Sequence, residues 1–397
     1  MRILFVIPRY WPSVGGAQLL TRQMVQRLST EHAVKIITHQ ADGSFIDAMA
    51  LARPNTYADG LVSVQRIGPD ALWRPLLRSL ARLYTSTRLV RPITAWVLHQ
   101  ALVPCMEGII HDFQPDVLHA IHIGLVYSSE IAQQAARRQN VGFVWTPLPH
   151  IVGDGWRGPR FRRLYQSADR LIAMTDTERQ WLIHQGAAAE RVSVIPFGPL
   201  ISRDHDAAAF RARHDLGDAL IVLFLGQKLP YKGFAQMAEA APLVWQEHPH
   251  TRFVFVGPRT AESTAFFATL HDPRILELPA IDEFEKNSAL AACDIFCMPS
   301  TQESLGGVYL EAWSYAKPVI AADIPTSQEI ISHGTDGLLV EQKGTAIAAA
   351  LIGLLADPEQ AAALGAAGQR KVAAVYVWEG LAGRLLDLYR SVADKRG

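Results

Sequence analysis

The fold is decided by one stretch, Leu220-Ile-Val-Leu-Phe-Leu-Gly226-Gln-Lys-Leu-Pro-Tyr-Lys232-Gly233, in which an apolar run leads into a glycine-bounded loop and a helical pattern follows to His248. A strand buried on both faces of a parallel sheet is nearly all apolar, and a helix carries the chain back to the next strand. The chain begins in the same way, with an apolar run over 2–7, a loop and a helix from about 17 to 28. Two successive βαβ series predict an α/β fold with two facing Rossmann-like domains.

A linker separates the two series. Pro196-Phe-Gly-Pro199 and the polar residues after it interrupt the alternation, so we expect the linker at about 197–205. The predicted N-terminal domain covers 1–198, and the predicted C-terminal domain covers 199–375. Residues 376–397 form a last element, an amphipathic helix with a single apolar face. That face consists of Leu381, Leu385, Leu388 and Val392.

Composition and charge bound the class of protein. Hydrophobic residues make up 49% of the chain and charged residues 19%, which excludes an intrinsically disordered protein. The net charge is zero, but residues 1–200 hold 21 Lys+Arg against 14 Asp+Glu, a charge of +7, and residues 201–397 hold 17 against 24, a charge of −7. The basic half predicts either an anionic partner, such as a phosphorylated acceptor or a membrane surface, or attraction between the two halves.

The three cysteines Cys105, Cys293 and Cys297 lack CxxC spacing, and we interpret them as core thiols in a reducing compartment. The N-terminal apolar run is too short for a signal peptide, and no run approaches the roughly 20 apolar residues of a membrane span. We expect a cytoplasmic protein, at most lying at the inner face of the membrane. No metal, cofactor or nucleic-acid partner is expected.

Residues 66–91 are rich in arginine, with leucines interleaved and Asp70 as the only acidic residue. A basic amphipathic helix can lie on an anionic membrane or bind an anionic acceptor. The alternative is an ordinary surface helix whose arginine stems cover apolar surface. The arginines of this stretch are Arg66, Arg74, Arg78, Arg82, Arg88 and Arg91.

Two loops carry the residues suited to binding an anionic ligand. Gly226 to Gly233 lies between a strand and a helix and holds two lysines, so backbone amides, a helix dipole and ammonium groups favour a diphosphate. The alternative is that the lysines are merely solvated. Gly15 and Gly16 follow the first strand and can likewise admit a phosphate or sugar, although a plain turn is equally compatible.

The second loop, Pro299 to Ala312, carries Glu303 and, eight residues on, Glu311. Gly306 and Gly307 bring the backbone close to a ligand at the start of a helix. A carboxylate on this helix can accept hydrogen bonds from a ribose diol, and Glu303 can reach hydroxyls of a sugar beyond the diphosphate. A solvated helix face is the alternative.

These residues, with 317–340, resemble the retaining GT-B glycosyltransferases of family four, and Gly15-Gly16, 116–119 and 194–198 fit the same family. The resemblance spans nearly the whole chain except 41–110. It implies two Rossmann-like domains with the donor in the cleft, transfer with retention and without a bound metal, and a C-terminal helix that crosses back to the first domain. The departing phosphate itself would deprotonate the acceptor.

By position, the resemblance assigns Lys232 to the donor diphosphate, Glu311 to the ribose and Glu303 to the sugar hydroxyls. The family has Arg in the place of Gln227, and one charge of the diphosphate clamp, a contribution of about 3 kcal/mol, is therefore missing. Either the neighbouring Lys228 replaces that charge, or the enzyme is slow or binds its donor differently. The predicted donor-binding residues are Gly16, Gly226, Lys228, Lys232, Glu303, Ser304, Leu305, Gly306, Gly307 and Glu311.

Three histidines complete the candidates. The family often places a cleft-facing His after the fourth N-terminal strand, and His119 and His122 both follow it here, so the two are predicted catalytic residues together with Glu303 and Lys232. His150, with Gly15, is predicted on the acceptor side. Each histidine could instead be an ordinary structural polar residue.

The predicted function is transfer of a hexose-type unit from a UDP- or GDP-sugar to a hydroxyl of a glycan or lipid-linked acceptor, in the synthesis of cell-surface polysaccharide or glycolipid. The basic stretch 66–91 motivates the lipid option and peripheral membrane contact. The alternatives are a GT-B phosphorylase or sugar-phosphate synthase, and a non-catalytic nucleotide-sugar-binding protein. A dehydrogenase is disfavoured because no Gly-x-Gly-x-x-Gly follows either first strand.

Overall fold

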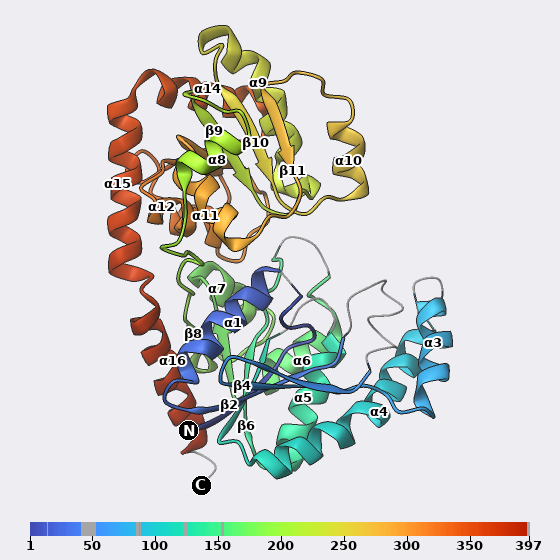
Figure 1. Ribbon diagram of the computed structural model, residues 1–397. Coiled ribbons are helices and arrows are strands. Elements are labelled where there is room, and N and C mark those ends of the chain that lie inside the picture. The colour runs from blue at the N-terminus through green and yellow to red at the C-terminus, as the bar shows by residue number, and fades with distance from the viewer. Residues whose placement is uncertain are drawn as a thin grey trace. The chain divides into compact units, whose positions relative to one another are not determined.

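The computed structural model describes residues 1–13, 15–40, 53–84, 87, 89–121, 126–151 and 155–394. The chain forms two compact units (Figure 1). Unit 1 consists of Met1–Pro149, Gly153–Ile195 and Glu379–Gly397, and unit 2 consists of His150–Val152 and Pro196–Trp378. Each unit is a mostly parallel sheet covered by helices, so the prediction of an α/β fold with two Rossmann-like domains is confirmed.

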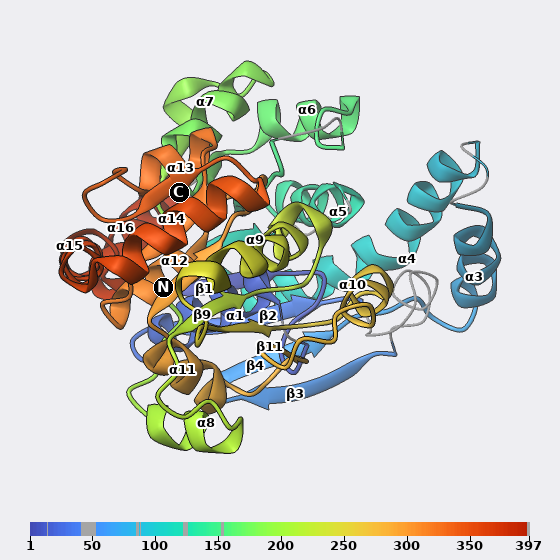
Figure 2. The same cartoon turned by 90° about the horizontal axis from the view of Figure 1, so that it is seen from above.

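The sheet of unit 1 has eight strands in the order β3-β4-β2-β1-β5-β6-β7-β8. All neighbours are parallel except β3, which pairs antiparallel with β4 at the sheet edge (Figure 2). The apolar run at the N-terminus lies near the centre, where Ile3 pairs with Val34 on one side and with Val117 on the other. The strands are β1 (Arg2–Val6), β2 (Ala33–Thr38), β3 (Asn55–Asp59), β4 (Val62–Arg66), β5 (Val117–Ile121), β6 (Gly142–Thr146), β7 (Arg170–Ala173) and β8 (Val192–Val194).

Helices cover this sheet and form a core with it. One of them, α4 (Val90–Phe113), is the single unbroken helix of the described residues that is long and apolar enough to cross a membrane, a length that the sequence analysis did not anticipate. Of the most apolar segment of this helix, 56% is buried inside the protein. Val97, Leu98 and Met106 belong to the core of unit 1. The other helices are α1 (Gly16–Leu28), α3 (Trp73–Tyr84), α5 (Val126–Arg138), α6 (Pro159–Ser167), α7 (Asp176–His184) and the 3-10 turn η1 (Ala189–Arg191).

The helix α16 (Trp378–Ala393) belongs to unit 1 from Glu379 onward. Its predicted apolar face is buried: Leu381, Leu385, Leu388 and Val392 are each at most 8% exposed. The contact is close, because a Cβ on Gly142 of β6 would lie 2.3 Å from Val392 Cγ1. The helix is therefore an integral part of the core of unit 1.

Unit 2 has a parallel sheet of six strands in the order β11-β10-β9-β12-β13-β14. The chain runs outward from β9 in one direction and outward from β12 in the other, so a topological switch point lies between them. The strands are β9 (Ile221–Leu225), β10 (Arg252–Val256), β11 (Ile275–Leu278), β12 (Ile295–Met298), β13 (Val319–Ala322) and β14 (Leu338–Val340). The helices are α8 (Ala207–Arg213), η2 (Pro230–Lys232), α9 (Phe234–Glu247), α10 (Ala261–Phe267), α11 (Glu283–Ala292), α12 (Gly307–Ser314), α13 (Pro325–Ile330), α14 (Gly344–Ala356) and α15 (Pro358–Val375).

Candidate functional site

The loops after β9 and β12 meet at the switch point of unit 2. The amide of Thr301 donates to Tyr231 O at 2.8 Å, which joins the second loop to the first. Gln342 Nε2 donates to Tyr231 O at 2.9 Å and to Pro299 O at 2.6 Å, so one side chain braces both loops. Ligands of open α/β sheets bind at the carboxyl ends of the strands at such a switch point.

An ion pair bridges the two loops: Lys232 Nζ lies 2.5 Å from Glu303 Oε1. The two side chains are 17% and 10% exposed, so solvent screens the pair only in part. The two residues that the sequence assigned to a diphosphate and to sugar hydroxyls are thus in direct contact. In this state the ammonium of Lys232 is neutralised by the carboxylate of Glu303.

Two glycines hold these loops in conformations that other residues rarely adopt. Gly233 has φ +80°, and an added Cβ would lie 2.7 Å from Pro299 O. Gly306 has φ +73° and precedes α12, and its added Cβ would lie 2.4 Å from the ring of Tyr309. Both positions therefore require glycine for backbone and steric reasons.

Glu311 lies one turn into α12 and is 5% exposed. Its Oε2 accepts a hydrogen bond from Lys286 Nζ of α11 at 3.1 Å, and Lys286 also donates to Leu200 O. Burial raises the pKa of Glu311, and the charge and hydrogen bond of Lys286 offset only part of this rise. The carboxylate predicted to meet the ribose is thus a paired, buried group at the start of the helix.

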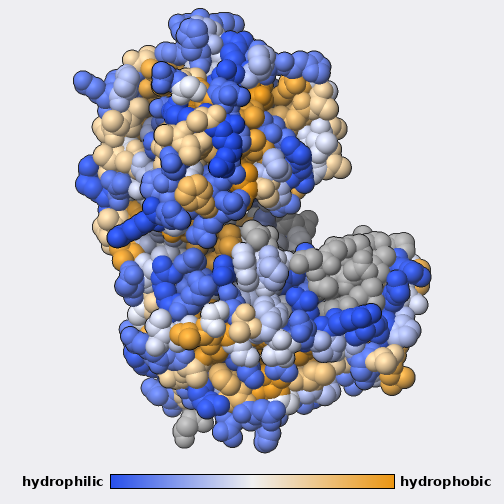
Figure 3. All heavy atoms as spheres, viewed as in Figure 1, coloured by the Kyte–Doolittle hydropathy of each residue, from blue (hydrophilic) through white to orange (hydrophobic). Residues whose placement is uncertain are grey.

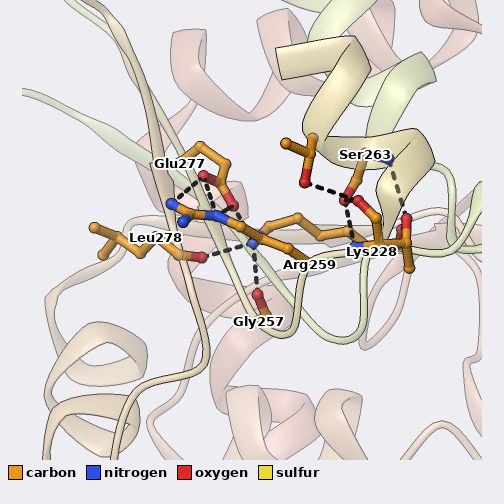
Figure 4. Close-up of polar contacts among 8 residues, drawn as sticks. Lys228, Gly257, Arg259, Ser263, Glu277 and Leu278 are labelled. Carbon is orange, nitrogen blue, oxygen red and sulfur yellow. Dashed lines mark hydrogen bonds and ion pairs between the residues drawn. The ribbon is translucent and has the colours of Figure 1, made fainter. Parts of the chain in front are cut away.

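Lys228 does not face the switch point, which contradicts its predicted role in binding the donor. Its side chain is fully buried, and Nζ donates to Gly257 O and Leu278 O, both at 2.6 Å, and to Glu277 (Figure 4). Glu277 is also held by Arg259 at 2.7 Å. An ammonium has three donors, and three are in use here, so Lys228 does not supply the charge missing at the exposed Gln227.

His119 is also placed differently from its prediction as a catalytic residue. It is 1% exposed within unit 1, with Nδ1 2.6 Å from Tyr389 Oη and Nε2 2.7 Å from Thr146 Oγ1. Burial lowers the pKa of His119 to about 3, so its imidazole is neutral at neutral pH. Both ring nitrogens are occupied, and His119 is a buried link between β5, β6 and α16. His122 and Arg88 lie outside the described residues.

The acceptor-side residues fall in both units. His150 groups with unit 2, where its Nδ1 lies 3.3 Å from Gln302 Oε1 and its ring meets that of Tyr231 edge to face. Gly15 caps α1 in extended backbone, and an added Cβ at Gly16 would meet nothing within 4 Å. Packing within the chain thus gives no reason for glycine at position 16.

The structure adds polar partners that the sequence analysis missed. Lys286 pairs with Glu311, Gln342 joins the two loops through Tyr231 O and Pro299 O, and Glu277 binds the buried Lys228. No spacing pattern marks them, because each partner lies on a different element from the residue it contacts. Among the residues that the structure describes, no group of three His, Cys, Asp or Glu could hold a metal ion.

Known protein families match most of both units. The family described as glycosyl transferase 4-like domain matches residues 15–198. The family described as glycosyl transferases group 1 matches residues 219–357. Phosphatidyl-myo-inositol mannosyltransferase of Mycobacterium tuberculosis is 26% identical over 404 residues, which cover 99% of this chain and 97% of that protein. D-inositol 3-phosphate glycosyltransferase of Thermobispora bispora is 33% identical over 245 residues, 57% of each chain.

The chain spans 57% and 62% of the length of two D-inositol 3-phosphate glycosyltransferases that it matches. Among solved structures, Anabaena HepE in complex with UDP-glucose has a TM-score of 0.76 at 19% identity, covering 98% of this chain and 100% of that one. This likeness confirms the predicted GT-B type of fold.

Proposed function

Because the chain belongs to the group 1 glycosyl transferases, we propose that it transfers a hexose-type sugar from a UDP- or GDP-sugar to a hydroxyl group of an acceptor, with retention of configuration. The acceptor is a glycan or a lipid-linked molecule of cell-surface polysaccharide or glycolipid synthesis. The relatives support this choice, since their names describe transfer to D-inositol 3-phosphate and to phosphatidyl-myo-inositol.

One observation carries the proposal: a lysine and a carboxylate, Lys232 and Glu303, meet across the two loops of the switch point. The ammonium suits the charge that develops on a departing diphosphate. The carboxylate suits the hydroxyls of the sugar attached to it. The buried Glu311 suits the ribose between diphosphate and base, by the same acceptor chemistry.

A nucleotide panel tests the donor. Calorimetry with UDP, GDP, ADP and their glucose and mannose conjugates should single out one diphosphate, and ligand at 100-fold its Kd should stabilise the chain by about 2.7 kcal/mol. The anomeric configuration of the product, followed by proton NMR, tests retention. Binding without turnover in acceptor mixtures would favour a non-catalytic binder, and turnover that requires phosphate would favour a phosphorylase. Failure of every nucleotide to bind would overturn the proposal.

Gly16→Ala should separate stability from function. Gly16 is the first residue of α1 and an added Cβ meets nothing, so alanine is expected to leave stability unchanged or raise it by about 0.5–1 kcal/mol. If a ligand approaches this backbone, kcat/KM should fall at least tenfold. Thermal unfolding and initial rates check the two effects. Gly353→Ala in α14, where a Cβ also meets nothing, is the control that should change stability alone.

We place the protein in the cytoplasm at the inner face of the membrane, in contact through α3 and the start of α4. Helix α3 has no acidic residue in its sequence and exposes Arg78 and Arg82, while Leu77 and Ala81 face the core. The α3–α4 pair extends to one side of the sheet of unit 1, with hydrophilic and apolar residues side by side on its surface (Figures 1–3). The large apolar residues exposed here are Leu72, Leu76, Leu83, Leu89, Ile93 and Trp96. Arginines beside exposed apolar side chains match an anionic lipid surface.

Charge reversal tests this contact. Arg78→Glu with Arg82→Glu should lower co-sedimentation with vesicles of phosphatidylglycerol and phosphatidylcholine at least tenfold, because each arginine near such a surface contributes about 1 kcal/mol. Arg162→Glu with Arg163→Glu, exposed residues of α6, is the matched control. The contact would be contradicted if both pairs of substitutions lowered vesicle binding equally. It would also be contradicted if the parent chain bound vesicles of pure phosphatidylcholine as well as those containing phosphatidylglycerol.

A further inference from the structure

The side chain of Gln342, two residues beyond β14, contacts the backbone of both loops of the switch point in unit 2. Its Nε2 donates to Tyr231 O at 2.9 Å and to Pro299 O at 2.6 Å. An amide nitrogen carries two N–H groups, and both are in use here. Tyr231 directly precedes Lys232, and Pro299 begins the loop that holds Glu303. One amide therefore links the segments that carry the two residues proposed to hold the donor.

The backbone next to Gln342 is held in place by the packing of α14 on α9. Gly344, the first residue of α14, lies so close to α9 that an added Cβ would be 3.0 Å from Glu239 Cβ. One turn further on, Ile347 is fully buried. Helix α9 itself continues directly from Gly233, at the end of the first loop. Gln342 thus extends from a firmly packed helix, which is what a side chain needs in order to fix the position of other segments.

Two kinds of contact hold the loops together in the free protein. One is the ion pair of Lys232 with Glu303. The other is a set of hydrogen bonds to Tyr231 O, from the amide of Thr301 at 2.8 Å and from Gln342. A diphosphate that binds Lys232, and sugar hydroxyls that bind Glu303, would replace the ion pair. The hydrogen bonds to backbone oxygen use neither of these two side chains, so they are the contacts that remain once the donor has bound.

The spacing of the loops matters most for a ligand that spans both of them. A sugar nucleotide has to meet Lys232 with its diphosphate and Glu303 with its sugar, and a misplacement of about 1 Å can lower a rate about 100-fold. A nucleoside diphosphate lacks the sugar and does not need Glu303. The proposed ribose contact, Glu311, lies on α12, which is fixed separately because Trp313 is fully buried and donates to Asp336 O at 2.8 Å. Loss of the spacing should therefore affect the sugar nucleotide selectively.

We propose that Gln342 is a positioning residue for sugar transfer: it sets the distance between the loop of Lys232 and the loop of Glu303 while the donor is bound. This role rests on the proposed function and deepens it, because it names the side chain that keeps the two donor-binding loops in register. Both N–H groups of Gln342 are occupied by Tyr231 O and Pro299 O, so the side chain acts on the donor through these two segments.

The test compares the full chain with Gln342→Met, because methionine has nearly the length of glutamine and no N–H group. Calorimetry with UDP, UDP-glucose, GDP and GDP-mannose measures binding, and release of UDP or GDP from the sugar nucleotide, with water as acceptor, measures turnover. The sugar nucleotide should bind at least about fivefold more weakly to the variant, and the nucleoside diphosphate within about twofold of the parent value. Release should fall at least about tenfold. Gln342→Asn, which keeps both N–H groups on a shorter side chain, is a milder variant that should show the same pattern.

Gln369→Met is the matched control, because Gln369 is exposed on α15 and also donates to a backbone carbonyl, Ser314 O at 3.1 Å. It should leave both affinities and the release of nucleotide unchanged. A link that served stability alone would lower Tm and weaken the nucleoside diphosphate and the sugar nucleotide by the same factor. Equal weakening of the two ligands in Gln342→Met, or release at the parent rate, would overturn the positioning role and leave the proposed function standing. If the parent chain bound none of the four nucleotides, the proposed function would fail, and this role with it.

Discussion

Glu303→Gln is expected to bind a nucleoside diphosphate more tightly than the parent chain while losing sugar transfer. In the structure the carboxylate of Glu303 forms an ion pair with the ammonium of Lys232 at 2.5 Å. A diphosphate that binds this ammonium therefore has to displace the carboxylate. Glutamine removes that competing charge, and we expect a threefold to tenfold gain in affinity, the equivalent of about 1 kcal/mol for a partly exposed pair. The contact to the sugar is lost at the same time, and transfer should fall at least 100-fold.

Lys232→Ala is the opposite variant and should lose diphosphate affinity and transfer together. Glu341→Gln is the matched control, because Glu341 forms an ion pair with Lys343 in which both side chains are 64% exposed. Calorimetry with UDP and GDP, and initial rates with the donor that binds, measure the effects. A Glu303→Gln variant that binds diphosphate more weakly than the parent would show that the carboxylate is no competitor.

Lys228→Met is expected to destabilise unit 2 by about 3–5 kcal/mol, the usual cost of removing one partner of a buried ion pair. The substitution removes the ammonium that pairs with Glu277, and it leaves the carbonyl groups of Gly257 and Leu278 without their donor. Urea unfolding followed by circular dichroism measures the loss. Lys343→Met, at an exposed lysine, should have no effect.

The double variant Lys228→Met with Glu277→Leu should recover much of that stability, since apolar residues can replace a buried pair at little net cost. Arg259 is 49% exposed and can return to solvent in this variant. If Lys228→Met kept full stability and lost nucleotide binding, the ammonium would serve the donor after all, as its place in the loop sequence predicts.

The sequence indicated the strand ends of the site correctly but not the direction of every side chain there. Apolar runs and glycine loops identify a strand and its carboxyl end, and the loops holding Lys232 and Glu303 were found in this way. Whether a polar residue at a strand end faces solvent or the core depends on its partners. His119 binds Tyr389, 270 positions away, and no local pattern carries that information.

The same limit accounts for the remaining differences. Glu311 was identified, but its partner Lys286 lies on α11 and matches no motif. Lys228 and Lys232 look equivalent in the sequence, four residues apart in one loop, yet one is fully buried and the other pairs with Glu303.

The place of α16 within unit 1 has a consequence for how the chain matures. Protein synthesis starts at the N-terminus, and domains generally fold as units once their residues are available. Nearly all of unit 2 is one continuous segment that ends at Trp378, whereas unit 1 needs Glu379 and the residues after it to cover β5 and β6. The half that is made first is therefore finished last, and a nascent chain lacking α16 presents the apolar surface that chaperones recognise.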